Sequence, residues 1–188
     1  MFTNPNLNEY FYWLVNNRQS DRGYLPEPIS REKISRILEA ARVAPSACNA
    51  QPWKFVVVDE PELKNKLADA AASKVLGINH FTKQAPVHIA IVIEGANFNS
   101  KFGSLVKGKT LPLIDIGIVA EHICLAAKAE GLGSCMLGWF DESAVKKLLD
   151  IPKSKRVPLI ITLGYPQTEE IREKKRKTVN EVVSFNKY

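Results

Sequence analysis

The sequence predicts an α+β protein on the strength of two observations. Segments with helical apolar spacing alternate along the chain with short runs that are rich in β-branched residues. Their predicted order is helix, helix, strand, helix, strand, irregular segment, helix, strand, helix and strand. This order fits an α+β architecture better than a doubly wound sheet. With 188 residues the chain is most simply a single domain, 1–188.

Five segments have the spacing or the boundary residues of helices. The first covers 6–18, and the second begins at Ser30, whose hydroxyl suits an N-cap position. The second helix should end near Val43, because the residue before Pro45 disfavours helical backbone. Residues 113–130 are apolar or small around most of the helix circumference, which predicts a central, buried helix. The two remaining helices are predicted over 60–72 and 141–149, the latter with Asp141 as its N-cap.

Four runs are predicted to be buried strands, because β-branched and other apolar residues dominate them. They cover 54–59, 86–93, 134–138 and 157–163. Residues 95–112 are irregular and glycine-rich, and a loop of this length in a compact domain is often functional. The chain after Gly164 is polar and basic and then becomes apolar again over 182–185, which indicates that its end docks onto another surface.

The charge of the chain limits the classes of partner. There are 26 Lys and Arg against 20 Asp and Glu, a net charge of +6, with the densest basic run at 172–177. This run could contact nucleic acid, but no recognised nucleic-acid module accompanies it, so we expect no such partner. No apolar run approaches the ~20 residues of a membrane span, and the N-terminus lacks the pattern of a secretory signal. We therefore expect a cytoplasmic protein with no membrane partner.

The cysteines and histidines do not have the spacing of disulfides or metal ligands. Cys48, Cys124 and Cys135 are odd in number and widely separated, which favours free thiols. The three histidines form no HExxH or related pattern. We expect them to be core or surface residues, and we expect no metal site.

Three polar joints carry the candidate chemistry. In RQSDR (18–22), two guanidinium groups four residues apart can hold an anion through charge-assisted hydrogen bonds. PSACNAQPW (45–53) places small residues and carboxamides between a helix and a strand, and the glycines of GLGSCMLGWF (131–140) permit close approach of a flat ligand. The glycine loops GxGxxG and GxxxxGK[ST] are missing, so a phosphorylated cofactor would need side-chain cations.

Together these segments resemble the nitroreductase-like FMN-dependent oxidoreductase family. The resemblance rests on RQSDR, PSACNAQPW, EHICLAAKAEGLGSCMLGWFDE and REKKRKTVNEVV, and it covers essentially the whole chain. It implies a three-layer sandwich in which helices flank a mixed, mainly antiparallel central sheet. It also implies a homodimer with FMN at the subunit interface and a C-terminal segment exchanged between the subunits.

The resemblance implies a role for each residue that matches a family motif. Arg18 and Ser20 are expected to contact the FMN phosphate and ribityl chain, with Gln19 assisting through its backbone or side chain. Lys174 and Arg176 are expected to complete the phosphate site.

A second group of residues is expected around the isoalloxazine ring. Arg22 would lie at the pyrimidine edge, Leu137 and Gly138 would offer backbone contacts, and Asn79 is the candidate for a further polar contact. The connector of the other subunit is expected to line the ring through Pro45, Ser46, Ala47, Asn49 and Gln51.

The implied activity is an alternating, ping-pong reaction. NADH or NADPH gives a hydride to FMN, and an electron-poor small molecule such as a nitroaromatic compound or a quinone then takes the electrons. Because the flavin carries this chemistry, we expect no catalytic residue from the protein. The alternative is an FMN-binding protein that is not a reductase, such as a flavin carrier or a redox sensor. Phe98 and Phe102, within 95–112, would either cover the flavin or close the core.

Overall fold

The computed structural model of the chain describes residues 6–73, 77–95 and 111–188. Phe98 and Phe102 lie outside the described residues. The helices are α1 (Asn6–Asn17), α2 (Arg31–Arg42), α3 (Pro61–Ala71), α5 (Leu111–Ala129), α6 (Glu142–Leu148) and α7 (Val179–Val182). The strands are β1 (Trp53–Val58), β2 (Val87–Ile93), β3 (Gly133–Leu137) and β4 (Arg156–Gly164), and the 3₁₀ turns are η1 (Ala47–Asn49) and η2 (His80–Gln84).

The strands form a sheet in the order β1-β2-β4-β3, and each neighbouring pair is antiparallel. Trp53 is opposite Ile93 at one edge, and β3 pairs with β4 from Gly133 opposite Gly164. An isolated parallel bridge joins Ser20 to Ser134 of β3. The α+β fold with a mainly antiparallel central sheet, which the sequence resemblance implied, is therefore confirmed.

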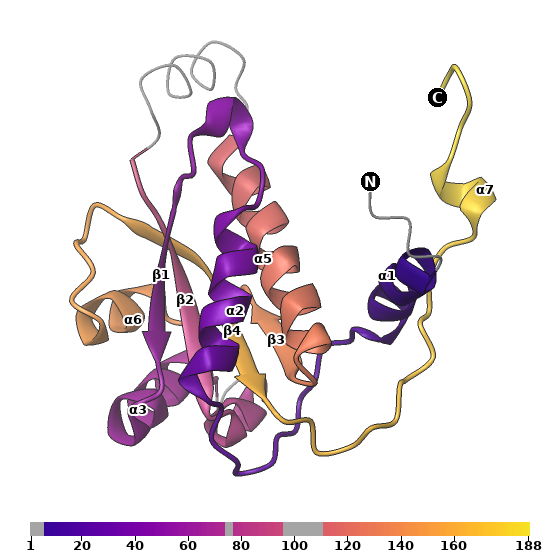
Figure 1. Cartoon of the computed structure of the whole chain (residues 1–188). Helices are drawn as coiled ribbons and strands as arrows, with labels where there is room; N and C mark the ends of the chain where they lie inside the picture. Colours follow the sequence, from indigo (N-terminus) through magenta and orange to yellow (C-terminus); the bar gives the residue numbers. More distant parts are fainter. Residues whose placement is uncertain (1–5, 74–76, 96–110) are drawn as a thin grey trace.

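Helices cover both faces of this sheet, which gives three layers (Figure 1). Successive side chains of a strand point to opposite faces, so the apolar run of β2 supplies both cores. Ile89 and Ile91 pack into the core beneath α2 and α5, whereas Ala90 and Val92 pack into the core on the α3 and α6 side. The predicted central helix 113–130 is α5, which begins two residues earlier than predicted and packs against α2.

Short-range signals in the sequence account for two helix starts. The Ser30 hydroxyl accepts a hydrogen bond from the Lys33 backbone nitrogen at 3.3 Å, and an Asp141 carboxylate oxygen accepts one from the Ala144 backbone nitrogen at 2.9 Å. Each bond satisfies a backbone donor that the first helical turn would otherwise leave without a partner. Both predicted N-caps are therefore confirmed.

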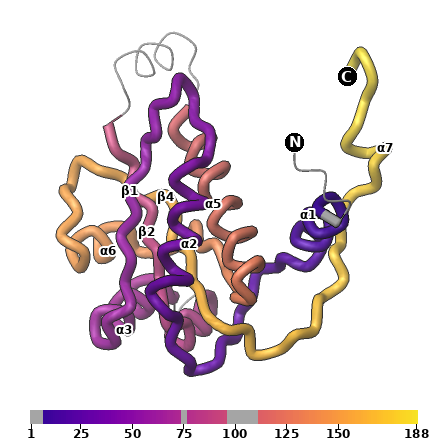
Figure 2. Tube along the Cα trace, viewed as in Figure 1, coloured from indigo at the N-terminus to yellow at the C-terminus, as the bar shows by residue number. Residues whose placement is uncertain are grey.

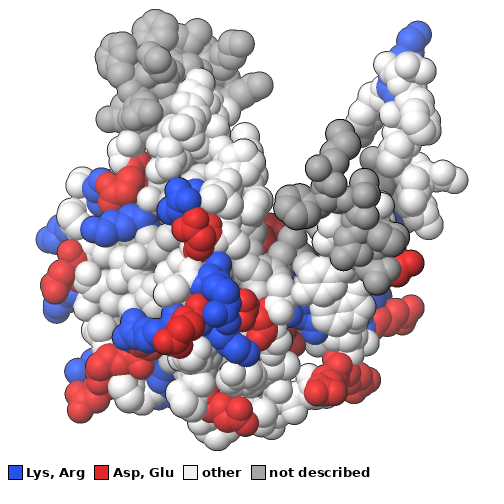
Figure 3. All heavy atoms as spheres, viewed as in Figure 1, with Lys and Arg blue, Asp and Glu red and all other residues white. Residues whose placement is uncertain are grey.

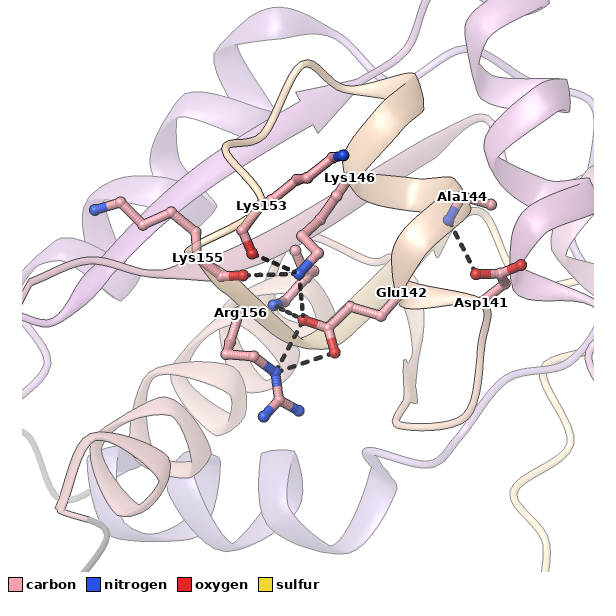
Figure 4. Close-up of polar contacts among 8 residues, drawn as sticks. Asp141, Glu142, Ala144, Lys146, Lys153, Lys155 and Arg156 are labelled. Atoms are coloured by element: carbon pink, nitrogen blue, oxygen red, sulfur yellow. Dashed lines mark hydrogen bonds and ion pairs between the residues drawn. The ribbon is translucent and has the colours of Figure 1, made fainter.

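A lysine closes the loop between α6 and β4 (Figure 4). The Lys146 ammonium donates hydrogen bonds to the backbone oxygens of Lys153 and Lys155 at 3.2 and 2.9 Å, and it lies 3.5 Å from a Glu142 carboxylate oxygen. Glu142 in turn accepts from the Arg156 guanidinium at 3.0 Å. This cluster fixes the entry into β4, the strand that lies between β2 and β3.

The two ends of the described chain extend away from the sheet. After β4 the chain forms an extended C-terminal arm, residues 165–188, which runs past α1 before it reaches α7 (Figure 2). On the face seen in Figure 3, charged side chains gather on the body of the molecule and the outer part of this arm is mostly uncharged. Both α1 and the arm expose large apolar side chains, namely Tyr10, Phe11, Tyr12, Trp13, Val179, Val182, Val183 and Phe185. Within the described residues, no helix has the length and apolar character that a bilayer crossing requires.

Candidate functional site

The RQSDR segment lies along the start of β3. The Asp21 backbone nitrogen donates to the Ser134 backbone oxygen at 2.9 Å, and the Ser134 nitrogen donates to an Asp21 carboxylate oxygen at 3.3 Å. A Cβ atom on Gly133 would come within 2.7 Å of the same Asp21 carboxylate. Gly133, the second glycine of GLGS, is therefore required for RQSDR to pack against β3. This requirement is separate from the close approach of a ligand.

Burial and neighbouring cations affect the two ionisable groups that flank this docking. Burial raises the pKa of the Asp21 carboxyl, and its hydrogen bonds from Ser134 and Gln19 act in the opposite direction. Burial, followed by the charges of Arg18, Arg176 and Arg172, lowers the pKa of the Lys174 ammonium. The charge contributions to the second shift come from cations of RQSDR and of the C-terminal segment, which therefore lie near Lys174.

Arg18 and Lys174 form the centre of this cationic cluster. The Lys174 ammonium donates a hydrogen bond to the Arg18 backbone oxygen. The Arg18 Nε atom is buried, and it lies 3.3 Å from a Glu121 carboxylate oxygen at an angle that makes no hydrogen bond. Glu121 is the single carboxylate that the described residues pair with Arg18, so the cluster has more positive than negative charge. An anion is the ligand that this arrangement favours.

The predicted ring contacts meet in a hollow that Arg22, the last residue of RQSDR, helps to line. Arg22, Asn79, Leu137 and Gly138 all line a hollow of about 500 Å³, with Trp139 at its exposed rim. Asn79 has a left-handed backbone, with φ of 63°, and its amide nitrogen donates to the backbone oxygens of Ala71 and Trp139, both at 3.0 Å. A Cβ on Gly138 would meet nothing within 4 Å, so the end of β3 is open to a ligand.

Two other hollows contain none of the predicted site residues. One of about 590 Å³ lies among Tyr24, Lys64 and Lys83, and one of about 1070 Å³ lies along α6. Their walls combine prolines and lysines with carboxylates, two lysines against two carboxylates in the first and three against two in the second, and neither wall includes RQSDR or the end of β3. Chemistry, and not volume, therefore identifies the hollow beside Arg22 as the candidate site.

The connector 45–52 lies at the other end of α2, away from RQSDR (Figure 1). Cys48, Asn49 and Gln51 all have left-handed backbone, with φ of 51°, 51° and 46°. Such residues cost energy, and they cluster where a site requires a special backbone shape. Within one chain, the connector and the cationic cluster are not brought together.

Hydrogen bonds hold the connector in this shape. An Asp115 carboxylate oxygen accepts from the Ala47 nitrogen at 3.0 Å, and the Ser46 hydroxyl accepts from the Gln51 nitrogen at 2.9 Å. The Gln51 amide donates to the Asn49 amide oxygen at 3.1 Å. Pro45, Asn49 and Gln51 are exposed. The predicted ring-lining residues therefore form a shaped, accessible surface.

Sequence reasoning missed several residues that build the site. Asp21 and Arg172 form hydrogen bonds with Gln19. Asp115 accepts a hydrogen bond from Ala47, and Glu121 forms an ion pair with Arg18. Asp21 lies inside the RQSDR motif, so its position was a signal, but its partner Ser134 is 113 residues away. Within the described residues no group of three or more His, Cys, Asp or Glu side chains is arranged to hold a metal ion.

The fold and the site together define an α+β protein with a cationic anchor beside a polar hollow. A model of the nitroreductase family matches residues 15–165, and the chain belongs to this family. A protein of Archaeoglobus fulgidus with the provisional name NADH dehydrogenase/NAD(P)H nitroreductase is 34% identical over 162 residues, which are 84% of this chain and 86% of that protein.

Solved structures with the same fold agree with this assignment. A nitroreductase family protein from Clostridium novyi NT is 33% identical, with a TM-score of 0.74 over 87% of this chain and 88% of that chain. An FMN-dependent nitroreductase from Clostridium difficile R20291 is 27% identical, with a TM-score of 0.76 over 93% of this chain and 98% of that chain. The family that the sequence motifs indicated is therefore confirmed.

Proposed function

We propose that the protein is an FMN-dependent oxidoreductase that takes a hydride from NADH or NADPH and reduces an electron-poor small molecule, such as a nitroaromatic compound or a quinone. The observation that carries this proposal is the contact of Lys174 with Arg18 in RQSDR, the segment whose Arg22 lines the hollow together with Asn79. Oxidoreductase chemistry is common to the names of the relatives, and the C. difficile neighbour is named as FMN-dependent.

The residues of the cluster fit a phosphate group. The buried Arg18 Nε atom has no hydrogen-bond partner among the described residues, and the charges that act on Lys174 are three arginines and one carboxylate, Glu121. A phosphate carries close to two negative charges and accepts several hydrogen bonds, so it would supply what both groups lack. Arg18, Ser20, Lys174 and Arg176 would hold it.

The hollow lined by Arg22 fits the flavin ring. Arg22 would lie at the pyrimidine edge, and Asn79, Leu137 and Gly138 would line the ring from the same chain. From a second copy of the chain, the connector would contribute Pro45, Ser46, Ala47, Asn49 and Gln51. This arrangement requires a homodimer, and the exposed apolar side chains of α1 and of the C-terminal arm support one.

The protein would orient the reaction and tune its electrostatics. Bound FMN would supply the hydride acceptance and electron delivery, so the nicotinamide donor and the acceptor would react in turn, by a ping-pong mechanism. The Arg22 guanidinium would stabilise the negative charge that develops at the pyrimidine edge on reduction. We propose no protein nucleophile, and we place the activity in the cytoplasm, where NADH and NADPH are available.

Anaerobic spectroscopy of the purified protein tests this proposal. After loading with FMN and removal of free flavin, the protein should be yellow, and NADH or NADPH should bleach the flavin bands. Addition of a quinone or a nitroaromatic compound should then restore them. A protein that stays colourless after loading would contradict the proposal, whereas bound FMN that neither nucleotide bleaches would favour a flavin carrier or sensor.

A further inference from the structure

The Gln19 side chain joins the RQSDR segment to the C-terminal segment. Its amide nitrogen donates to an Asp21 carboxylate oxygen at 3.1 Å and to the Glu170 backbone oxygen at 3.0 Å. Its amide oxygen accepts from the backbone nitrogen and from the side-chain Nε of Arg172, both at 3.2 Å. Both ends of this carboxamide therefore have protein partners, which leaves the Gln19 side chain committed to the protein and not to a ligand.

Arg172 completes the connection from the other side. Its Nη2 atom donates to the Ser20 backbone oxygen, so its guanidinium bonds to two consecutive residues of RQSDR. Beyond Arg172, the Lys174 ammonium makes the one further hydrogen bond that the described C-terminal residues form with the rest of the chain. From Lys175 to the end of the chain the residues are exposed. The contacts of Gln19 and Arg172, together with the bond from Lys174 to Arg18, thus hold the segment that carries Lys174 and Arg176 against RQSDR.

We propose that Gln19 and Arg172 form a latch that positions Lys174 and Arg176 for the phosphate of the cofactor, and that phosphate binding and closure of the latch stabilise each other. This inference rests on the proposed function. Gln19 and Arg172 are positioning residues: neither contacts the phosphate, and both act through the cations that follow them.

Electrostatics explains why the latch and the phosphate would be coupled. Closing the latch seats the Lys174 ammonium on the Arg18 backbone oxygen, beside Arg172 and Arg176. Burial, and then repulsion by these arginines, lowers the pKa of the Lys174 ammonium. A phosphate between these cations replaces repulsion with attraction. Because the coupling between two events is reciprocal, whatever holds the latch closed should strengthen phosphate binding, and a bound phosphate should hold the latch closed.

Binding of FMN and of riboflavin to four proteins tests the positioning role. The proteins are the wild type, Gln19→Ala, Arg172→Lys and the control Lys175→Ala, whose exposed side chain lies outside the latch. Arg172→Lys keeps the charge but loses the planar fork. We expect both latch variants to raise the Kd for FMN about 5- to 30-fold, the loss of one or two hydrogen bonds, with riboflavin affinity unchanged because riboflavin has no phosphate. Lys175→Ala should match the wild type.

Three results would overturn the latch while leaving the proposed function in place. The first is unchanged FMN affinity in Gln19→Ala. The second is wild-type FMN affinity in Arg172→Lys, which would mean that Arg172 contributes only its charge. The third is a loss of riboflavin affinity in the latch variants equal to their loss of FMN affinity. A wild-type protein that binds no FMN would instead contradict the proposed function itself. The two failures are therefore distinguishable.

Limited digestion with trypsin tests the reciprocal effect, in which a bound phosphate holds the latch closed. The segment 172–177 contains five basic residues, each a trypsin site, and the latch lies at its start. At constant protein concentration, FMN should slow cleavage in this segment and riboflavin should not. Gln19→Ala should be cleaved faster than the wild type in the absence of ligand. Equal protection by FMN and riboflavin, or no protection by either, would contradict the coupling.

Discussion

At the scale of single residues, His88 has an unusual environment. Its imidazole is fully buried in β2, and neither ring nitrogen has a hydrogen-bond partner among the described residues. Burial, and then the charge of Lys64, lower the pKa of His88 from its usual 6.5 to about 4. The nearby Thr82 backbone acts to raise this pKa, but it does not form a hydrogen bond with the ring. The ring is therefore neutral in the folded protein at neutral pH.

The stability of the protein should consequently fall in mild acid. Between pH 6.5 and 4 the unfolded state binds a proton on His88 that the folded state does not bind, so the free energy of unfolding should decrease as the pH falls. The His88 contribution should be about 1.4 kcal/mol per pH unit in this window and zero above it. Urea denaturation from pH 4 to 8 measures this slope.

Comparison of two variants isolates the His88 contribution. His88→Leu removes the buried imidazole and should flatten the slope between pH 4 and 6.5, whereas His80→Gln, at an exposed position, should leave it as in the wild type. If His88→Leu retained the full wild-type slope, another group would be responsible for the acid sensitivity.

Sequence reasoning could not identify contacts between residues that are far apart in the chain. The motif RQSDR was identified as an anion site, yet the roles of its individual side chains depend on distant contacts. Gln19 meets Glu170 and Arg172 across 151 and 153 residues, and Asp21 lies against Gly133. The types of residue in a motif indicate its chemistry, whereas their division between ligand and protein contacts depends on packing.

At the scale of elements, prediction succeeded where a signal is local. The Ser30 and Asp141 caps each bond to a backbone nitrogen three residues away, so both were visible in the sequence. The strained backbone of the connector was not visible. Its left-handed residues Cys48, Asn49 and Gln51 are not glycines, and contacts such as that of Asp115 with Ala47 stabilise a shape that local preference disfavours.

The loop between α6 and β4 offers a test at this scale. Lys146→Met keeps the apolar stem but leaves the backbone oxygens of Lys153 and Lys155 without their donor. The free energy of unfolding should fall by about 1–3 kcal/mol in chemical denaturation. The neighbouring Lys147 is exposed, so Lys147→Met should change stability by less than about 0.5 kcal/mol. Equal effects of the two substitutions would show that the Lys146 bonds add no stability.

At the scale of the whole molecule, the predicted cofactor residues form two separate groups. Arg18, Arg22 and Lys174 lie with the start of β3 and the C-terminal segment, and the connector lies at the opposite end of α2 (Figure 1). The family resemblance anticipated this division, because it assigned the connector to the other subunit. Composition and periodicity could not have done so, since they describe one chain.

Complementation between two defective variants tests this central claim most directly. Arg18→Ala should weaken FMN binding about 10- to 150-fold, because a charge-assisted bond to phosphate contributes about 1.5–3 kcal/mol. Ala47→Phe should obstruct the space that the small connector residues leave for the ring. If each site combines Arg18 of one chain with the connector of the other, a heterodimer of these variants has one intact site.

The measurement is the FMN content of differently tagged Arg18→Ala and Ala47→Phe chains that are co-expressed and purified as a heterodimer. We predict about one FMN per pair of chains, bound with wild-type affinity, at concentrations where neither variant homodimer retains the cofactor. A heterodimer that binds no more FMN than the two homodimers, or a chain that remains monomeric when loaded with FMN, would contradict a site shared between two copies.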